Sequence, residues 1–511
     1  MTFDKKKTDY SIYLVTDSGL VPEGLTLEHQ VEQSILGGAT LIQLREKTAE
    51  TGKFLETAKR VHAITKKHGV PLLINDRLDI ALAIDCEGVH VGQDDMPVVE
   101  CRRMLGKDKI IGLSITNREE YEAALAADKT GADIDYFGVG AVYGTFTKKL
   151  RAEPLGLSGM RALFAYITEQ EAKLAQKHAF VTIGGVKPGN TASVRYMCGN
   201  TCNGVAVVSC IIAAEDAKKA TEELAKQWHE TIPKPSVGLS ADSLKAVNSF
   251  FGTPVFVHHI TNNVVKNVSA NITIAIGSSP AMSETRAEFR EFAAIPSASL
   301  LLNMGTATPD GVETFLAAGQ AYNAARRPVV FDPVGGGASE ARKSAVKTLL
   351  KGIRMSVIKG NDGEIFSAAG LAGKMRGVDS IGESGLEERV EAAAKLSRDA
   401  NAVVVMTGKK DVVMAPSGKY VLCNNGDEYL TQITGSGCML GSVITSVVAG
   451  HTDSVFDAAL AGLLLYTIAS EKAGPKSDGP GTFMPRLIDE ISVLAKTGVK
   501  PEDIQVEFGQ L

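Results

Sequence analysis

The sequence is poor in aromatic residues and contains no long apolar run. Aromatic residues make up 6% of the 511 residues, whereas glycine occurs 51 times. This balance favours an α/β fold with many tight turns. No apolar run approaches the roughly 18 uninterrupted residues of a membrane-spanning helix, and the polar N-terminus lacks the apolar core of a signal peptide. We therefore expect a cytoplasmic protein that does not bind membranes.

A strong net charge and a paired set of cysteines are also missing. The formal net charge is −5, which provides no basic surface for nucleic acid. The seven cysteines form an odd set, and no second close pair completes a zinc site with Cys198 and Cys202. These absences predict reduced thiols, small-molecule substrates and no nucleic-acid partner.

The chain divides into two patterned halves. Its length exceeds the roughly 250 to 300 residues at which a single core stops growing. Residues 230–242 contain two prolines and a glycine between the two halves, which is typical of an interdomain linker. We predict one domain over residues 9–229 and a second over residues 243–511.

The first half predicts a parallel (β/α)8 barrel, because short apolar runs alternate with segments of helical spacing. The helical segments include residues 27–36, 54–68, 118–127 and 160–176. The predicted strands are Ile12 to Val15, Leu41 to Leu44, Pro71 to Ile74, Gly88 to Val91, Ile110 to Leu113, Tyr136 to Val139, Phe180 to Ile183 and Gly204 to Val208.

Polar clusters follow seven successive predicted strands, from the second to the eighth. The loops at the C-terminal ends of barrel strands open on one face, so we expect these side chains to gather there. Taken singly, Asp76 also fits a helix cap and Gly184-Gly185 a plain tight turn. Together, the clusters predict a pocket for magnesium and a phosphorylated substrate. They are residues 43–47, 75–77, 92–95, Ser114, 144–149, 184–185 and 208–209.

Residues 9–229 resemble thiamine phosphate synthases in the order and content of these clusters. The most specific elements are Gln43-x-Arg45-x-Lys47 and Thr145-x-Thr147-Lys148, whereas Gly144 stands where the family usually has proline. The resemblance implies that hydroxymethylpyrimidine pyrophosphate is joined to a thiazole phosphate with release of pyrophosphate.

The resemblance also implies a role for each matching residue. The pyrimidine pyrophosphate would be held by Gln43, Arg45, Lys47, Asn75 and Lys148. The thiazole phosphate would be held by Thr145, Thr147, Gly185, Val208 and Ser209. Asp76 and Asp95 would bind Mg²⁺, and Ser114 would lie close to the reacting centre.

The second half predicts a sheet covered by helices on both faces. Residues 412–415 and 420–423 flank a Pro-Ser-Gly-Lys turn, which predicts an antiparallel hairpin at one edge. The other predicted strands are Val255 to Val257, Ile272 to Ile276, Leu300 to Leu302, Val329 to Phe331, Ser356 to Ile358 and Val403 to Met406.

A glycine-rich run, Thr434 to Gly441, precedes an apolar helical segment and suits an anion at a helix N-terminus. The sequence contains neither a Walker loop nor a Rossmann fingerprint, so the run alone does not establish nucleotide binding.

Residues 243–500 resemble hydroxyethylthiazole kinases of the ribokinase-like group. The matching stretches are residues 258–263, 279–282, 303–306, 332–337, 359–364, 407–408 and 434–441. The resemblance implies ATP as co-substrate and assembly into a trimer or a multiple of three. Lys359 is a departure, because arginine is common at that position.

This second resemblance also implies individual roles. Cys438 would orient or deprotonate the thiazole alcohol, although a buried cysteine often only fills a turn. Met282, Asn263 and Gly305 would line the thiazole pocket. The remaining roles are magnesium binding by Asp332 and Glu364, and ATP binding by Lys359, Thr407, Gly435 and Gly437.

Two other interpretations compete with a bifunctional enzyme. One half could have lost catalysis and act as a sensor or scaffold, which the complete motifs in both halves argue against. Alternatively, an unrelated phosphate-binding barrel could be fused to a sugar kinase. The three donors Gln43, Arg45 and Lys47 at one strand end disfavour that alternative.

Overall fold

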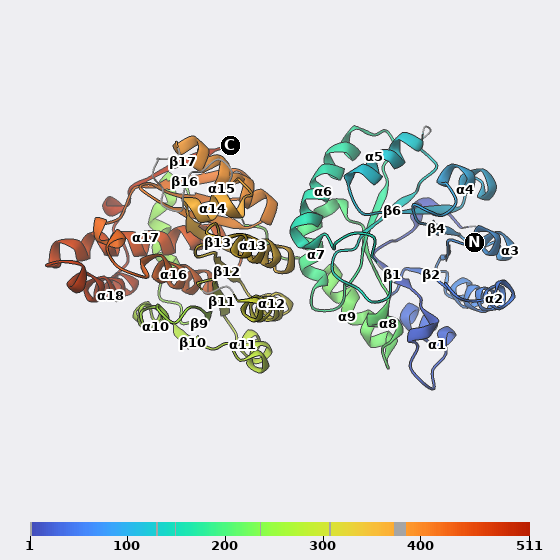
Figure 1. Ribbon diagram of the computed structural model, residues 1–511, viewed down its shortest axis with the longest axis horizontal. Helices are drawn as coiled ribbons and strands as arrows, with labels where there is room; N and C mark the ends of the chain where they lie inside the picture. The colour runs from blue at the N-terminus through green and yellow to red at the C-terminus, as the bar shows by residue number, and fades with distance from the viewer. Residues whose placement is uncertain (1–2, 129–130, 149, 236, 306–307, 372–384) are drawn as a thin grey trace. The chain divides into compact units, whose positions relative to one another are not determined.

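The computed structural model describes residues 3–128, 131–148, 150–235, 237–305, 308–371 and 385–511. The chain forms two compact units, Met1–Ile232 and Pro233–Leu511 (Figure 1). The division falls within the stretch of residues 230–242 that the sequence marks as a linker. Among the described residues, no helix combines the length and apolar character needed to cross a bilayer.

The first unit is a closed barrel of eight parallel strands, which confirms the predicted fold. Strand β1 pairs with β2 on one side and with β8 on the other, so the sheet has no free edge. The strands are β1 Ile12–Val15, β2 Leu41–Leu44, β3 Leu72–Asn75, β4 Gly88–Val91, β5 Ile110–Ile115, β6 Tyr136–Gly140, β7 Ala179–Ile183 and β8 Gly204–Val207.

Helices surround these strands (Figure 1), and several begin or end at residues suited to a cap. The Thr26 hydroxyl accepts a hydrogen bond from the His29 amide at the start of α1, and Gly69 ends α2 with a φ of 70°. The helices are α1 Leu27–Leu36, α2 Thr51–His68, α3 Leu78–Ile84, α4 Val98–Leu105, α5 Arg118–Ala127, α6 Gly156–Lys173, α7 Thr191–Cys198, α8 Ser209–Ile212 and α9 Ala217–His229.

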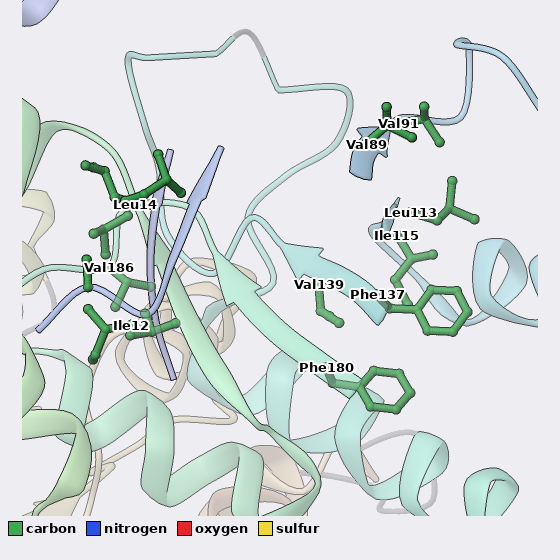
Figure 2. Close-up of a cluster of buried hydrophobic side chains, with 14 of the residues drawn as sticks. Ile12, Leu14, Val89, Val91, Leu113, Ile115, Phe137, Val139, Phe180 and Val186 are labelled. Carbon is green, nitrogen blue, oxygen red and sulfur yellow. The ribbon is translucent and has the colours of Figure 1, made fainter. Parts of the chain in front are cut away.

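Successive side chains along the barrel strands point alternately outward and inward. The outer face is apolar, and the inner face carries polar groups. Leu14, Val89, Val91, Leu113 and Ile115 belong to the core between strands and helices (Figure 2). Because neighbouring residues on a strand point to opposite faces, the residues between them point into the barrel. This parity places the site residues of β4 and β5 inside the barrel.

The second unit is a nine-stranded sheet in the order β10-β9-β11-β12-β13-β14-β15-β16-β17. The strands from β10 to β14 are parallel, whereas β15, β16 and β17 add antiparallel, which confirms the predicted antiparallel edge. The strands are β9 Phe256–Ile260, β10 Ser279–Met282, β11 Ala298–Asn303, β12 Val329–Asp332, β13 Val357–Asn361, β14 Val403–Thr407, β15 Asp411–Met414, β16 Lys419–Cys423 and β17 Val506–Gln510.

Helices cover both faces of this sheet and enclose two cores. Leu301 and Val330 pack with α16 and α17 on one face, whereas Leu300 and Leu302 pack with α12 on the other. The helices are α10 Lys266–Ala275, α11 Phe289–Ala294, α12 Pro309–Ala324, α13 Glu340–Gly352, α14 Asp362–Ala368, α15 Leu386–Ala400, α16 Ser436–Gly450, α17 Val455–Ala473 and α18 Pro480–Thr497.

One predicted strand is wrong. Residues 272–275 lie in helix α10 rather than in a strand, and Ile276 follows as its C-terminal cap. The β-branched residues suggested a strand, but Ile272 is buried while Ile274 is 60% exposed, which suits one face of a surface helix. The edge strand is instead β10, whose Pro280 is tolerated because an edge needs fewer backbone donors.

The end of the predicted linker is bound to the second unit. The Asp457 carboxylate on α17 accepts hydrogen bonds from the backbone amides of Gly238, at 2.9 Å, and Leu239, at 3.1 Å. Leu239 is buried in the core of that unit, and the 3-10 helix η4, Ala241–Phe250, follows it. The chain therefore joins the second unit before residue 243.

Candidate functional site

A cavity of about 440 Å³ lies at the C-terminal ends of the barrel strands. Its wall contains residues from the loops after several strands, as expected for the catalytic face of such a barrel. Ten of the residues singled out from the sequence lie in this wall: Gln43, Arg45, Asn75, Ser114, Thr145, Thr147, Lys148, Gly185, Val208 and Ser209.

Three further predicted residues form an ionic cluster outside the described cavity wall. Lys47 pairs with the Asp76 carboxylate, and the Asp95 carboxylate accepts a hydrogen bond from the Gly92 amide at 2.7 Å. Burial and the neighbouring Asp76 carboxyl raise the pKa of Asp95. Two adjacent carboxyl groups are an environment that a cation relieves.

The backbone at Asp76 is strained. Its φ is 61°, in the left-handed region that non-glycine residues rarely adopt outside turns. Asp76 directly follows β3, and its amide donates to the His90 carbonyl at 2.9 Å. Strain of this kind concentrates at functional sites.

The cationic donors of the cavity lie in loops that follow the strands. The Arg45 guanidinium lies 3.4 Å from the Asp17 carboxylate, which follows β1, and the Arg45 amide donates to the Thr16 hydroxyl at 3.0 Å. The Lys148 side chain is exposed in the loop after β6. Lys149, which belongs to the same predicted cluster, lies outside the described residues.

The threonine loop packs closely against the glycine turn after β7. The hydroxyls of Thr145 and Thr147 lie 2.9 Å apart. Gly185 has a φ of 65°, and a Cβ built there would come within 2.8 Å of the Gly144 carbonyl oxygen. The turn therefore requires glycine for both its conformation and this close approach.

Tyr13, His90 and Tyr136 also line the cavity, and the sequence analysis did not identify them. Desolvation lowers the pKa of His90 to about 3, with Lys148 and Asp95 as the charged groups that also act on it. Burial raises the pKa of both tyrosines above the ordinary value. Each of the three is a polar residue in an otherwise apolar strand, at a position that faces the barrel interior. This was the sequence signal that could have identified them.

The second unit contains a buried polar cluster where β11, β12 and β13 meet the start of α16. The Asn303 amide nitrogen lies 3.1 Å from the Asp332 carboxylate and 3.1 Å from the Cys438 sulfur. The Lys359 ammonium lies 3.3 Å from the same carboxylate. One amide thus joins the predicted base to the predicted acidic residue.

Burial dominates the electrostatics of this cluster. It raises the pKa of Asp332 to about 6, and the Asp332 Oδ1 atom has no hydrogen-bond partner among the residues that the structure describes. Burial opposes the charge of Lys359, but Asp332, Glu364 and Cys438 together outweigh it and raise the pKa of that ammonium. Burial and the Asp332 charge also raise the pKa of the Cys438 thiol.

Glycines shape the start of α16. Gly435 precedes the helix with a φ of 86°, and a Cβ there would lie 2.9 Å from Val265. A Cβ on Gly437 would lie 2.9 Å from the Lys359 ammonium. Lys359 is therefore directed at the helix N-terminus, where backbone amides favour an anion.

Glu364 and Thr407 lie beside this cluster. The Glu364 carboxylate accepts hydrogen bonds from the Gly335 amide, at 2.8 Å, and from the Asn361 amide, at 2.9 Å, which completes a capping box at the start of α14. The Thr407 hydroxyl at the end of β14 donates to the Gly360 carbonyl at 3.4 Å.

The predicted thiazole residues occupy the neighbouring strand ends. Met282 ends β10, and Asn263 is exposed in the loop after β9. Gly305 donates its amide to Asn303 at 3.2 Å. Asn262, which the sequence analysis did not single out, donates to the Asn303 side chain at 3.1 Å. Thr306 of the same predicted motif lies outside the described residues.

No group of three or more histidine, cysteine or carboxylate side chains suited to a metal ion occurs among the described residues. The seven cysteines are all free thiols. Mg²⁺ is usually held by one or two carboxylates together with phosphate oxygens and water.

Comparison with known proteins matches each half to one family. The model of the thiamine monophosphate synthase family matches residues 12–211, and that of the hydroxyethylthiazole kinase family matches residues 247–497. A thiamine-phosphate synthase from Clostridium botulinum is 45% identical over 224 residues, which cover 44% of this chain and 96% of that protein.

Two relatives match over nearly the whole chain. The probable thiamine biosynthetic bifunctional enzyme of Schizosaccharomyces pombe is 40% identical over 529 residues, covering 99% of both chains. The thiamine biosynthetic bifunctional enzyme of Saccharomyces cerevisiae is 40% identical over 540 residues, covering 98% of both. The chain therefore belongs to the family of bifunctional thiamine biosynthetic enzymes, with thiamine-phosphate synthase activity in its barrel and hydroxyethylthiazole kinase activity in its second unit.

Proposed function

We propose that the barrel cavity is the coupling site and that its wall separates the two substrates. Gln43, Arg45, Lys47, Asn75 and Lys148 hold hydroxymethylpyrimidine pyrophosphate. Thr145, Thr147, Gly185, Val208 and Ser209 hold the thiazole phosphate. The observation that carries the proposal is that ten of the predicted residues, from six different strand ends, line one cavity.

The chemistry needs preset positive charge rather than a nucleophile. Pyrophosphate leaves as a multiply charged anion, so groups that stabilise the developing charge lower the barrier. Arg45 is oriented by Asp17 before substrate binds, which reduces the reorganisation needed when the bond breaks. Ser114, at an inward position of β5, lies close to the reacting centre.

Asp76 and Asp95 fit a Mg²⁺ ion bound together with the pyrophosphate. Burial and the neighbouring Asp76 carboxyl raise the pKa of Asp95, and oxygen ligands on one or two carboxylates are what Mg²⁺ prefers. When bound, the ion neutralises charge on the leaving pyrophosphate. Lys47 pairs with Asp76 at this site, and its ammonium would hold the pyrophosphate together with such an ion.

In the second unit, Cys438 takes the proton from the thiazole alcohol during phosphoryl transfer from ATP. The cluster supports this role because Asn303 contacts the sulfur and Lys359 faces the helix N-terminus, where the transferred group is held. Gly435, Gly437 and Thr407 contact the nucleotide phosphates. Met282, Asn263 and Gly305 bind the thiazole ring.

Asp332 and Glu364 serve the magnesium that accompanies ATP, and their surroundings differ. Within the described part of the chain, one oxygen of Asp332 has no hydrogen-bond partner, so Asp332 would be able to hold the ion. Both oxygens of Glu364 already accept backbone amides, so Glu364 acts through its charge and through the turns it holds.

The oligomeric state and location also belong to the proposal. Seven free thiols suit a reducing, cytoplasmic compartment. The resemblance of the second half to thiazole kinases supports a trimer or a multiple of three. Light scattering of the purified chain tests this, and a monomeric mass at assay concentration would contradict it.

The division of the cavity is tested by ligand binding to matched variants. Arg45→Ala should weaken binding of hydroxymethylpyrimidine pyrophosphate, measured by calorimetry, and leave thiazole phosphate binding unchanged. Thr147→Ala should show the opposite pattern. Equal weakening of both ligands in both variants would contradict the assignment, and kinase activity in the same preparations controls for protein quality.

A further inference from the structure

A continuous chain of hydrogen bonds crosses the interior of the barrel. The Gln43 amide nitrogen donates to the Tyr13 hydroxyl at 2.6 Å, and the Tyr13 and Tyr136 hydroxyls lie 2.8 Å apart. The Tyr136 hydroxyl lies 2.7 Å from His90 Nδ1, and His90 Nε2 lies 2.8 Å from the Ser114 hydroxyl. Five strands thus contribute one member each, and the chain ends at the proposed reacting centre.

Two glycines inside strands make room for these rings. A Cβ on Gly112 of β5 would lie 2.1 Å from the Tyr136 ring. A Cβ on Gly138 of β6 would lie 3.0 Å from His90 Cε1. Glycine weakens a strand, so its presence at both places indicates that close approach of the rings is required.

The donor-to-acceptor direction along this chain of hydrogen bonds follows from counting the available hydrogens. An amide nitrogen only donates, so the Tyr13 oxygen accepts from Gln43 and its single hydrogen is left for Tyr136. Tyr13 is buried, and Gln43 and Tyr136 are its hydroxyl partners within the described part of the chain. The Tyr136 hydroxyl must then donate onward, to His90 Nδ1.

This direction fixes the state of His90. Its Nδ1 accepts, so the ring is neutral and carries its proton on Nε2, which donates to the Ser114 oxygen. A cationic or Nδ1-protonated ring would leave one of the two buried tyrosine hydrogens without a partner, which is costly. The Ser114 hydroxyl hydrogen then remains free for a group in the cavity.

We propose that the chain from Gln43 to His90 is a positioning device that makes Ser114 a hydrogen-bond donor to the substrate. The inference rests on the proposed place of Ser114 at the reacting centre. A serine beside a histidine resembles a nucleophile with its general base. Here the direction of the hydrogen bonds is the reverse, because the histidine donates to the serine.

A donor suits the chemistry of the coupling reaction. The pyrophosphate oxygens gain negative charge as the bond to the pyrimidine breaks, and an oriented hydroxyl hydrogen stabilises that charge. His90 itself does not touch the substrate in this arrangement. Its tautomer, set by Tyr136, determines which way the Ser114 hydroxyl points.

The tautomer can be measured directly on the unmodified full-length enzyme. Nitrogen NMR of protein labelled with ¹⁵N-histidine distinguishes protonated from unprotonated ring nitrogens, and His90→Gln identifies the signals by their loss. We expect a protonated Nε2 and an unprotonated Nδ1. A proton on Nδ1, or on both nitrogens, would overturn the proposal.

Matched variants separate a donor from a base. In His90→Gln the side-chain amide nitrogen can occupy the place of Nε2 and donate to Ser114, whereas His90→Ala removes the donor. We expect His90→Ala to lower the coupling kcat about tenfold to a hundredfold with little change in KM, and His90→Gln to recover most of it. Equal loss in both variants, with the barrel folded, would indicate a base and contradict the proposal.

Ser114→Ala distinguishes this inference from the function on which it rests. A large loss of kcat supports Ser114 at the reacting centre. Full coupling activity in Ser114→Ala would remove that assignment and with it the donor role, while the tautomer measurement would still decide the direction of the chain. Tyr136→Phe removes the donor to Nδ1, and we expect a mixture of both tautomers in its spectrum.

Discussion

The two sites of this chain differ in how they hold charge before substrate arrives. In the barrel, the Arg45 side chain is 15% exposed and Lys47 49% exposed, around a cavity of about 440 Å³. In the second unit, the side chains of Lys359 and Asp332 are 5% and 1% exposed and pair with each other. Both sites pair their cations with carboxylates, but the barrel pairs stay partly open to solvent, whereas the pair in the second unit is buried.

The difference follows from what each reaction moves. The coupling site must accept two phosphorylated substrates and release pyrophosphate, so open cationic groups serve both binding and departure. The kinase site must take one proton from an alcohol and guide one phosphoryl group, which a small buried cluster at a helix N-terminus can do. Substitutions that inactivate one of the two sites should leave the activity of the other site intact.

The largest expected effect is loss of coupling in Asp76→Asn. The amide keeps the size of the side chain and tolerates the left-handed backbone, but it removes a charge from the proposed cation site. We expect coupling of supplied thiazole phosphate to fall by at least about a hundredfold. The kinase rate of the same variant is the control, and near-normal coupling would refute the role of Asp76.

A similar loss is expected in the other unit for Cys438→Ala. Removing a general base typically lowers a rate by about 10² to 10⁴-fold. Cys438→Asp restores a basic group at the same place and should keep much of the phosphorylation activity, measured by ADP release. An alanine variant as active as the parent would leave Cys438 with only a packing role.

The pH dependence of the kinase provides a subtler comparison. Burial and Asp332 raise the pKa of Cys438 above its ordinary value of 9.0, so the base form is scarce at neutral pH. Phosphorylation should therefore increase as pH rises toward that pKa, and this increase should disappear in Cys438→Asp. A parent rate that is flat from neutral to alkaline pH would contradict a thiol base.

The smallest effect concerns the packing of the barrel. Gly112→Ala places a Cβ against the Tyr136 ring, and we expect a loss of about 1 to 3 kcal/mol in barrel stability. Gly52→Ala, in α2 with open space around it, should change stability by less than about 1 kcal/mol and in the stabilising direction.

The single tryptophan makes this comparison specific. Trp228 lies buried in α9 of the barrel unit, beneath the Arg195 guanidinium, so its fluorescence reports on that unit alone during urea unfolding. Equal midpoints for Gly112→Ala and Gly52→Ala would show that the barrel accommodates the extra carbon. The close approach of Gly112 to the Tyr136 ring would then no longer support the hydrogen-bond chain.

The sequence predicted the barrel well because its signals are local. Strand bounds such as Ile12–Val15 and Leu41–Leu44 coincide with those predicted, since apolar runs end at turn residues. The strand prediction for residues 272–276 failed because it also relied on local signals. Their β-branched side chains favour a strand, but burial of Ser269, Ile272 and Thr273 on one face stabilises a helix instead.

The candidate sites were predictable where polar residues follow strands and not where they lie within them. Arg45 and Asp76 stood out directly after strands, whereas Tyr13, His90 and Tyr136 were hidden inside them. Their partnership joins β1, β4 and β6, positions separated by up to 123 residues in sequence. Only the closed barrel brings them together.

The kinase cluster shows the same limit. Cys438 and Asp332 were identified from motifs, but Asn303 was not recognised as the residue that contacts both. The raised pKa of the Cys438 thiol also depends on burial beside Asp332. Burial is a property of the folded unit that no single motif contains.

The most direct test of two separate active sites is one assay on three proteins. The parent, Asp76→Asn and Cys438→Ala receive hydroxyethylthiazole, ATP, magnesium and hydroxymethylpyrimidine pyrophosphate, and thiamine phosphate is quantified as fluorescent thiochrome. We predict product from the parent alone, and recovery of Cys438→Ala but not Asp76→Asn when ready-made thiazole phosphate is added. Recovery of Asp76→Asn, or failure to recover Cys438→Ala, would contradict the account.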